Sequence, residues 1–401
     1  MKNLDAKNFT VPGYKTWGIH CGIKKTDKKD LAIIASDREA AVAGVFTQNK
    51  VKAASIVLGM AKSKSGKGQV IVVNSGCANA CTGKQGLADA KETAEIAAQE
   101  LGVKPDMVYV ASTGVIGELL PMQKVRTGIA TAGGLLAPAG WSQAAEAIMT
   151  TDLFVKTVAV QEQIDGKTIT MAGIAKGSGM IHPGMATMLC FIVTDAAVAA
   201  PVLKKMLQSA TERSFNAITV DGDMSTNDMV LVMANGAAEN KKPAPGSKDM
   251  KKLQACLDAV TKSLALQVVK DGEGATKLVQ ITVQGAKNPA EAKRAATAVA
   301  TSSLVKTALF GEDANWGRIM AVLGSCGVDM EETRTDITFG KAKIVERGVG
   351  LGKAADKEAT ASLKQREVHI LIDLRKGKGE ATVWTCDLSY EYVKINAAYR
   401  S

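Results

Sequence analysis

One segment of the chain combines a candidate nucleophile with a backbone that could strain a peptide bond. Residues 175–196 read AKGSGMIHPGMATMLCFIVTDA, with glycines and a proline crowded into the first half and an apolar strand in the second. Thr187 stands where the two halves meet, and a threonine hydroxyl becomes an effective nucleophile when a base takes its proton. From spacing alone, the simpler interpretation is a tight loop before a core strand, with Thr187 as a polar residue at the start of that strand.

Other candidate motifs fail on their spacing. The stretch DGDMSTND (221–228) resembles a calcium loop, but its sixth position is Thr226, where glycine is needed, and its twelfth is Val232, where glutamate is needed. GVGLG (348–352) lacks the third glycine of a dinucleotide fingerprint and is better explained as a turn. Seven scattered cysteines without a CxxC pair, together with three histidines, do not favour a zinc site. We therefore expect no metal.

The elements around the glycine-rich segment alternate between strands and helices. An apolar run over 69–76 predicts a buried strand, and the helical spacing of apolar residues over 84–101 predicts a helix that ends at Gly102. Residues 107–113 predict another strand, and the pair Asp165-Gly166 predicts a hairpin turn. This alternation, with hairpins mixed in, indicates a layered α/β architecture with mixed sheets.

The second half of the chain continues the alternation. We expect helices over 200–215, 247–270 and 289–311, strands over 229–236 and 278–285, and a strand-rich tail over 335–400. Two prolines and a glycine in 239–249 make that stretch the best candidate for a linker.

Composition narrows the class of partners. The net charge of +10 comes from lysines that are spread along the chain without an aromatic and basic stripe, so we expect no nucleic-acid partner. The first residues, MKNLDAKNFTVPGYKTWG, lack the apolar stretch that is typical of a signal peptide, and no run has the apolar length of a membrane span, so we expect no membrane partner. An odd number of scattered cysteines is typical of reduced thiols, which predicts a cytoplasmic protein.

Several ordered blocks resemble one family, the ornithine acetyltransferases or glutamate N-acetyltransferases of arginine biosynthesis. The blocks are KGSGMIHPGMATML (176–189), NSGCANACTG (74–83), ASTGVIGELLPM (111–122), MTTD (149–152), SFNAITVDGDMSTND (214–228), VKDGEGATK (269–277), GEDANWGRIMAVLG (311–324) and YVKINAAYRS (392–401). The resemblance covers the chain from about residue 10 to its end, in the family's order. His182 and Gly184 depart from the pattern, since a smaller residue and an asparagine would be expected there.

The resemblance implies an α/β/β/α-type sandwich of the N-terminal-nucleophile kind, which cuts itself between Ala186 and Thr187. The products would be an α chain of residues 1–186 and a β chain of residues 187–401. Cleavage has a clear chemical consequence, because an α-amine has a pKa of about 7.7–8 and is partly neutral at cell pH. Thr187 would then supply both the nucleophile and the base.

The resemblance also assigns roles to other residues. Thr113 and Gly114, at the end of a predicted strand, match the family's oxyanion hole. Thr150, Lys176, Thr187, Glu273, Asn396 and Ser401 match its substrate-binding positions, although Thr151 equals Thr150 by residue type. Lys176 would pair with a substrate carboxylate and Glu273 with an ammonium. Because Asn396 and Ser401 lie at the chain end, we expect the C-terminus to fold back over the site.

The function that the resemblance implies is a ping-pong transfer of acetyl from N-acetylornithine to glutamate through acetyl-Thr187, without a cofactor. Some family members also accept acetyl-CoA as the donor, so acetyl-CoA is a second candidate substrate. The resemblance further implies a tetramer of two α and two β chains. The alternative is an N-terminal-threonine amidase or aminopeptidase, which would share the nucleophile but pass the acyl group to water.

Overall fold

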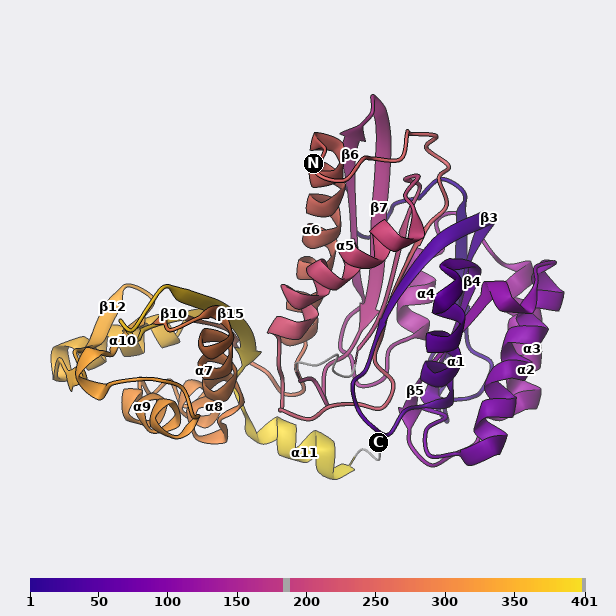
Figure 1. The fold of residues 1–401 in the computed structure, drawn as a ribbon. Coiled ribbons are helices and arrows are strands. Elements are labelled where there is room, and N and C mark those ends of the chain that lie inside the picture. Colours follow the sequence, from indigo (N-terminus) through magenta and orange to yellow (C-terminus); the bar gives the residue numbers. More distant parts are fainter. Residues whose placement is uncertain (183–187, 399–401) are drawn as a thin grey trace.

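The computed structural model describes residues 1–182 and 188–398, which form two bodies of unequal size (Figure 1). Within these residues, the larger body contains a nine-stranded sheet and the smaller body a six-stranded sheet. The chain passes from the first sheet to the second after the long helix α6 (Lys248–Lys270). Among the described residues, no helix combines the length and apolar character needed to cross a membrane.

The large sheet is mixed and has the strand order β1-β6-β7-β8-β9-β3-β4-β5, with β2 paired to β3. Its strands are β1 (Lys2–Asn3), β2 (Tyr14–Ile19), β3 (Leu31–Phe46), β4 (Lys67–Cys77), β5 (Val108–Val115), β6 (Lys156–Ile164), β7 (Lys167–Lys176), β8 (Leu189–Thr194) and β9 (Met229–Ala234). The β4–β5 and β8–β9 pairs are parallel, whereas β3 is antiparallel to both β4 and β9. The pairing of β3 with β4 shifts between Ala35 and Ala40, and such an irregularity bends a strand so that it can join two halves of a curved sheet.

The two halves of this sheet share a central core. Ile71 of β4 and Ile174 of β7 are far apart in the strand order, yet they belong to one buried hydrophobic cluster. Residues next to them in sequence face outward, because side chains alternate along a strand. Val70 packs with helices α2 (Gly83–Leu101) and α3 (Met122–Gly134) on one outer face, and Ala175 packs with α5 (Ala200–Glu212) and α6 on the other. The predicted α/β/β/α sandwich with mixed sheets is therefore confirmed.

Two shorter helices, α1 (Ala54–Lys62) and α4 (Trp141–Ala147), complete the larger body. Ile56 of α1 and Trp141 of α4 are fully buried in the same central cluster as the facing strands. The ring of Trp141 stacks on Phe9 at a centroid distance of 5.3 Å. These two helices therefore contribute to the core between the halves of the sheet.

The smaller body has the strand order β13-β12-β11-β14-β10-β15. Its strands are β10 (Leu278–Ala286), β11 (Asp336–Phe339), β12 (Ala342–Glu346), β13 (Val349–Gly350), β14 (Glu367–Asp373) and β15 (Gly379–Cys386), and its helices are α7 (Pro289–Thr301), α8 (Ser303–Phe310), α9 (Trp316–Ser325) and α10 (Lys353–Leu363). One hydrophobic cluster joins the inner face of this sheet to the helices. The last helix, α11 (Tyr390–Ala398), leaves this body and runs along the bottom of Figure 1, toward the larger body.

Local sequence signals are confirmed where a turn or cap controls the backbone. Helix α2 ends with Gly102 in the left-handed conformation, at φ 66°, which a glycine adopts without steric cost. The β6–β7 hairpin turns at Asp165 and Gly166, which both have positive φ values, 51° and 70°. Two positive φ values are typical of the hairpin turn whose twist matches the strands.

One predicted element is wrong in part. The single helix expected over 289–311 is two helices, because Ser302 is extended and its hydroxyl accepts a hydrogen bond from the Val305 amide, which caps α8. The tail is rich in strands, as expected, and it also contains α10 and ends in α11. Residues 239–249, the candidate linker, connect β9 to α6 within the larger body.

Candidate active site

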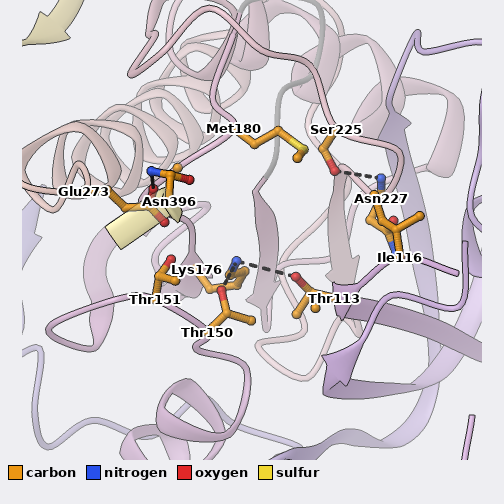
Figure 2. Close-up of a pocket in the computed structure, with 12 residues that line it drawn as sticks. Thr113, Ile116, Thr150, Thr151, Lys176, Met180, Ser225, Asn227, Glu273 and Asn396 are labelled. Carbon is orange, nitrogen blue, oxygen red and sulfur yellow. Dashed lines mark hydrogen bonds between the residues drawn. The ribbon is translucent and has the colours of Figure 1, made fainter. Parts of the chain in front are cut away.

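A pocket lies where several elements of the larger body end close to α11 (Figure 2). Its lining residues are Thr113, Gly114, Ile116, Thr150, Thr151, Lys176, Gly179, Met180, Ser225, Asn227, Glu273 and Asn396. They come from the ends of β5 and β7, the segments after α4 and before β9, the turn after α6, and α11. Among the described residues, every position that the sequence analysis assigned to the oxyanion hole or to substrate therefore lies in this one pocket.

Three predicted site residues, Ala186, Thr187 and Ser401, lie outside the described residues. The strand that follows Thr187 is described, and β8 pairs with β7 so that Leu189 is opposite Lys176. The Met188 amide donates a 3.0 Å hydrogen bond to Asp228 Oδ1. Lys176 is thus in register with a residue only two positions after Thr187.

Lys176 supplies a buried cation at the end of β7. The residue is 3% exposed, and its Nζ donates to Thr150 Oγ1 at 2.7 Å and to Thr113 Oγ1 at 3.5 Å (Figure 2). Burial lowers the pKa of the Lys176 ammonium, and the Asp152 carboxylate opposes that change. Since an ammonium has three donors, Lys176 retains a hydrogen for an anionic ligand.

Thr113 and Gly114 present a hydroxyl and a backbone N–H at the end of β5. The Lys176 ammonium can only donate, so the Thr113 hydroxyl accepts that bond and its own hydrogen remains available for another acceptor. Gly114 has φ 128°, and a Cβ at this position would lie 2.4 Å from the backbone carbon of Gly76. The close approach of β4 therefore requires glycine here.

Glu273 supplies a carboxylate in the turn after α6. Its amide donates to Ser178 O at 2.8 Å, and its side-chain Oε2 accepts from Asn396 Nδ2 at 2.7 Å. A Cβ on Gly179 would lie 2.4 Å from Glu273 Oε2, so only glycine permits this carboxylate to lie against the glycine-rich segment. Figure 2 shows Glu273 and Asn396 on one side of the pocket and Thr113 on the other.

Helix α11 is held against the pocket by polar contacts. Besides Asn396, Tyr392 donates its hydroxyl hydrogen to Asp221 Oδ2 at 3.2 Å. The same carboxylate accepts from the amides of Met180, at 2.5 Å, and Ile181, at 2.9 Å. Asp221 therefore joins the C-terminal helix to the glycine-rich segment, a role that the sequence analysis did not assign to it.

The structure separates Thr150 from Thr151, which are equal by residue type. Both line the pocket, but Thr150 bonds to Lys176, whereas Thr151 Oγ1 lies 2.7 Å from Ser178 Oγ. Asn227 also lines the pocket, and its Nδ2 donates to the carbonyl groups of Ala78 and Ser112, each at 2.7 Å. The sequence analysis quoted Asn227 within the block 214–228 without a role. A polar residue next to an apolar strand was the only signal for it.

Together, the fold and the pocket define an acyl-transfer enzyme that binds a small ligand with charges of both signs. A layered sandwich places a hydroxyl and a backbone amide at the end of one strand, beside a buried ammonium at the end of another. A hydroxyl and an amide suit the oxyanion that forms in acyl transfer. An ammonium and a carboxylate in one small pocket suit a ligand that carries the two opposite charges.

The chain belongs to the ArgJ family, whose model matches residues 15–401. A relative from Geobacter sulfurreducens, named arginine biosynthesis bifunctional protein ArgJ, is 51% identical over 393 residues, which cover 98% of this chain and 100% of the relative. A protein of the same name from Caldanaerobacter subterraneus subsp. tengcongensis is 49% identical over 407 residues and is matched over 100% of both chains. The family resemblance inferred from the ordered motifs is confirmed.

Solved structures with similarity to this chain include two from the same family. The crystal structure of arginine biosynthesis bifunctional protein ArgJ from Bacillus halodurans is 43% identical and has a TM-score of 0.49, over 51% of this chain and 96% of that chain. Ornithine acetyltransferase from Mycobacterium tuberculosis, complexed with ornithine, is 37% identical and has a TM-score of 0.43, over 45% of this chain and 97% of that chain.

Proposed function

We propose that this chain transfers an acetyl group from N-acetylornithine to glutamate in arginine biosynthesis. The Thr187 hydroxyl attacks the amide carbonyl, the nitrogen takes up a proton, and ornithine leaves as its amine while acetyl-Thr187 remains. The amine of glutamate then attacks this ester, so that N-acetylglutamate leaves and the hydroxyl is restored. The observation that carries the proposal is the placing of Lys176 and Glu273 in one pocket with Thr113 and Gly114.

Each charged group of the pocket has a partner on the proposed substrates. The Lys176 ammonium pairs with the substrate α-carboxylate, and the Glu273 carboxylate, with Asn396 beside it, pairs with the side-chain ammonium of ornithine. The Thr113 hydroxyl and the Gly114 amide stabilise the oxyanion that forms when the acetyl carbonyl is attacked.

We propose further that the peptide bond between Ala186 and Thr187 is cut by Thr187 itself, which frees its α-amine to act as the base. The strand pairing supports this, because the two products would share one sheet. β8 of the β chain pairs along its whole length with β7 of the α chain, and β9 pairs in the same way with β3. Cleavage would therefore leave the fragments folded together.

The remaining proposals concern donors, assembly and compartment. Acetyl-CoA as a second acetyl donor follows from the family resemblance, and the word "bifunctional" in the relatives' name agrees with a second activity. We propose that no cofactor takes part, because nucleophile, base and oxyanion donors all come from side chains and backbone. Two α and two β chains per enzyme follow from the family resemblance. All seven cysteines are free thiols, which supports a cytoplasmic enzyme.

The direct test combines intact-mass measurement with a transfer assay. We expect two fragments whose masses correspond to a cut at Ala186–Thr187. We also expect glutamate to divert the acetyl group of N-acetylornithine into N-acetylglutamate. A fully active protein that stays one chain would contradict the cleavage. If adding glutamate does not lower the rate at which acetate is released, the enzyme is an amidase instead.

Binding of the substrate carboxylate should weaken as the pH rises, at a lower pH than an ordinary lysine would give. The charged form of Lys176 is the binding form, and burial lowers its pKa, so the ammonium is lost before the usual value of about 10.4 is reached. N-acetylglutamate is a suitable probe, because it has no amine that titrates in this range. The measurement is its dissociation constant by calorimetry as a function of pH.

Lys176→Arg provides the control for this pH dependence, because a guanidinium stays charged throughout the range. The variant should lose affinity less steeply than the wild type as the pH rises. Equal losses in both proteins would show that another group controls the binding of the carboxylate.

A further inference from the structure

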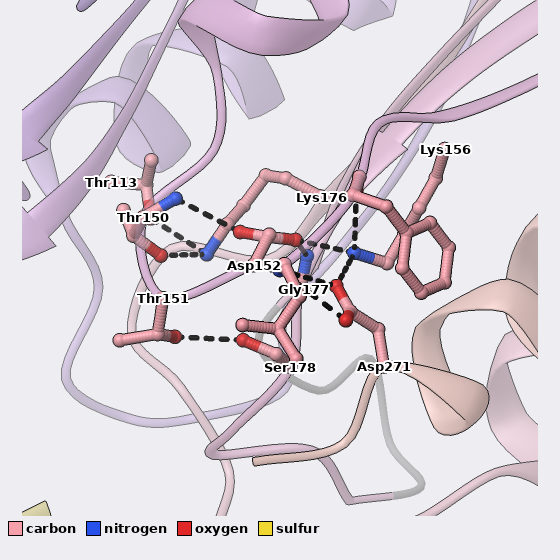
Figure 3. A network of polar contacts seen from close by, with 11 residues as sticks. Thr113, Thr150, Thr151, Asp152, Lys156, Lys176, Gly177, Ser178 and Asp271 are labelled. Atoms are coloured by element: carbon pink, nitrogen blue, oxygen red, sulfur yellow. Dashed lines mark hydrogen bonds and ion pairs between the residues drawn. The ribbon is translucent and has the colours of Figure 1, made fainter. Parts of the chain in front are cut away.

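A buried ion cluster lies next to the pocket and is formed by Lys156, Asp152 and Asp271 (Figure 3). Lys156 is the first residue of β6 and is fully buried, and its Nζ donates to Asp152 Oδ1 at 2.7 Å and to Asp271 Oδ2 at 2.5 Å. We call these three residues the Lys156 cluster. Taking an ammonium and two carboxylates out of water costs free energy, and their mutual attraction offsets this cost only in good geometry. A contribution to stability alone is therefore a weak explanation for the cluster.

The two carboxylates of the cluster hold the backbone of the pocket. Asp152 Oδ2 accepts from the Thr150 amide at 2.9 Å, and Asp152 Oδ1 accepts from the Gly177 amide at 2.7 Å. These amides belong to the segment after α4 and to the residue that follows Lys176. Asp271 Oδ2 accepts from the Leu153 amide at 3.0 Å. Through its pair with Asp152, Lys156 therefore connects the segments that carry Thr150 and Lys176.

The turn that carries Glu273 is connected to the Lys156 cluster through the end of α6. Asp271 caps this helix and precedes Glu273 by two residues, and the Glu273 amide bonds to Ser178 O. The Ser178 hydroxyl in turn lies 2.7 Å from Thr151 Oγ1 (Figure 3). The Lys156 cluster is thus connected, through hydrogen bonds and short stretches of backbone, to the segments that carry the pocket's ammonium and its carboxylate.

The charges of the cluster also act on Lys176 directly. Burial alone would raise the pKa of Asp152, but Lys176, Lys156 and the Gly177 amide together lower it to about 2. Asp152 therefore interacts with two ammonium groups, yet its hydrogen-bonded ion pair is with Lys156. Lys176 makes its hydrogen bonds to the Thr150 and Thr113 hydroxyls instead, inside the pocket.

We propose that Lys156 is a positioning residue: by pairing with Asp152 and Asp271, it leaves the Lys176 ammonium directed into the pocket, where it receives the substrate carboxylate. Without Lys156 the two carboxylates would lose their shared cation. Asp152 would then attract Lys176, and the held backbone at Thr150 and Gly177 would lose its anchor. This inference rests on the proposed function, because it assigns Lys176 to the substrate carboxylate.

The test is Lys156→Met, compared with the wild type in the transfer assay and in calorimetry with N-acetylglutamate. We expect the KM for N-acetylornithine and the dissociation constant for N-acetylglutamate to rise by about tenfold or more, because a charge-assisted contact is misplaced. The change in kcat should be smaller, since Thr113 and Thr187 are not part of the cluster. Lys270→Met is the matched control, because it removes an exposed ion pair to Glu367 from the same region and should change neither constant.

A second readout separates positioning from general loosening of the fold. The ionisable groups that act on Lys176 are Asp152, Lys156, Glu273, Asp228 and Lys24. Lys156 is a like charge that lowers the pKa of Lys176, so its removal should move the alkaline loss of N-acetylglutamate binding to higher pH. A merely destabilised protein would show a lower melting temperature without this shift.

If Lys156→Met yields no folded protein, the double variant Lys156→Met/Asp271→Asn carries the test. It restores the net charge of the cluster and leaves one unpaired carboxylate instead of two, while Asp152 still lacks its partner. A folded variant of either kind whose KM stays within about twofold of the wild type, with an unshifted pH dependence, would overturn the inference. Transfer by the wild-type enzyme in the same assay shows that such a result counts against Lys156 and not against the proposed function.

Discussion

Thr187→Ala should abolish both self-cleavage and acetyl transfer, because the proposed mechanism uses the same oxygen as the attacking atom in both reactions. In a hydrolase with a hydroxyl nucleophile, loss of the nucleophile alone lowers kcat by about 10⁶-fold. We therefore expect transfer below detection. A denaturing gel of the purified variant should show one intact chain, and the assay should be run at saturating N-acetylornithine so that a change in affinity cannot mimic the loss.

Thr187→Ser is the matched control, because it keeps the hydroxyl and removes only a methyl group. This variant should retain some cleavage and some transfer. Acetyl transfer by Thr187→Ala at a rate close to the wild type would show that another residue is the nucleophile. Cleavage without transfer would separate the two reactions and assign Thr187 to only one of them.

The second large effect is expected for Thr113→Ala. This side chain is 4% exposed at the end of β5, and its hydroxyl hydrogen is free to reach an oxyanion while its oxygen accepts from Lys176. Loss of one oxyanion donor typically lowers turnover by about 10²- to 10³-fold. We expect that decrease in kcat. The dissociation constant for N-acetylglutamate should change little, because this compound binds through its carboxylates and no oxyanion forms at equilibrium.

Thr127→Ala serves as the control for the removal of a threonine hydroxyl. Thr127 is exposed on α3, and its hydroxyl donates to the carbonyl of Gln123 in its own helix, at 3.1 Å, so loss of this hydroxyl should leave turnover unchanged. An effect of Thr113→Ala that is confined to KM would mean that the hydroxyl binds the ground state and does not stabilise the transition state.

The placing of the pocket explains why these effects should be large. Thr113, Lys176 and Glu273 are each almost completely buried and each is held by a neighbouring element, so their side chains need little reorganisation during the reaction. Donors that are already oriented stabilise a developing charge more strongly than mobile ones. A variant that leaves such a group unpaired should therefore affect the reaction more than the loss of an exposed contact would.

Local patterns in the sequence were sufficient for most single elements. The end of α2 at Gly102 and the hairpin at Asp165 and Gly166 depend on backbone conformations that few residue types adopt, so residue type alone predicted them. The break at Ser302 was missed because the apolar spacing continues across it. Only the cap that Ser302 makes to Val305 shows that a second helix begins there.

The candidate site residues came from matching motifs, and the structure brings those that it describes into one pocket. The motifs did not separate Thr150 from Thr151, since hydroxyl groups at adjacent positions are chemically equal. Geometry separated them, because Thr150 faces Lys176 and Thr151 faces Ser178.

The sequence by itself determined the family, the alternation of strands and helices, and the polar residues at the ends of strands, because these depend on residue type and on short spacings. Only the tertiary structure decided that the sheet curves back on itself and that Lys156 pairs with Asp271, 115 residues further along the chain. In the sequence, Lys156 is a lysine at the start of a strand, and nothing in its neighbours distinguishes it from an exposed lysine. Whether such a lysine lies in water or in a buried cluster depends on which distant carboxylates the fold brings to it, and no local pattern contains that information.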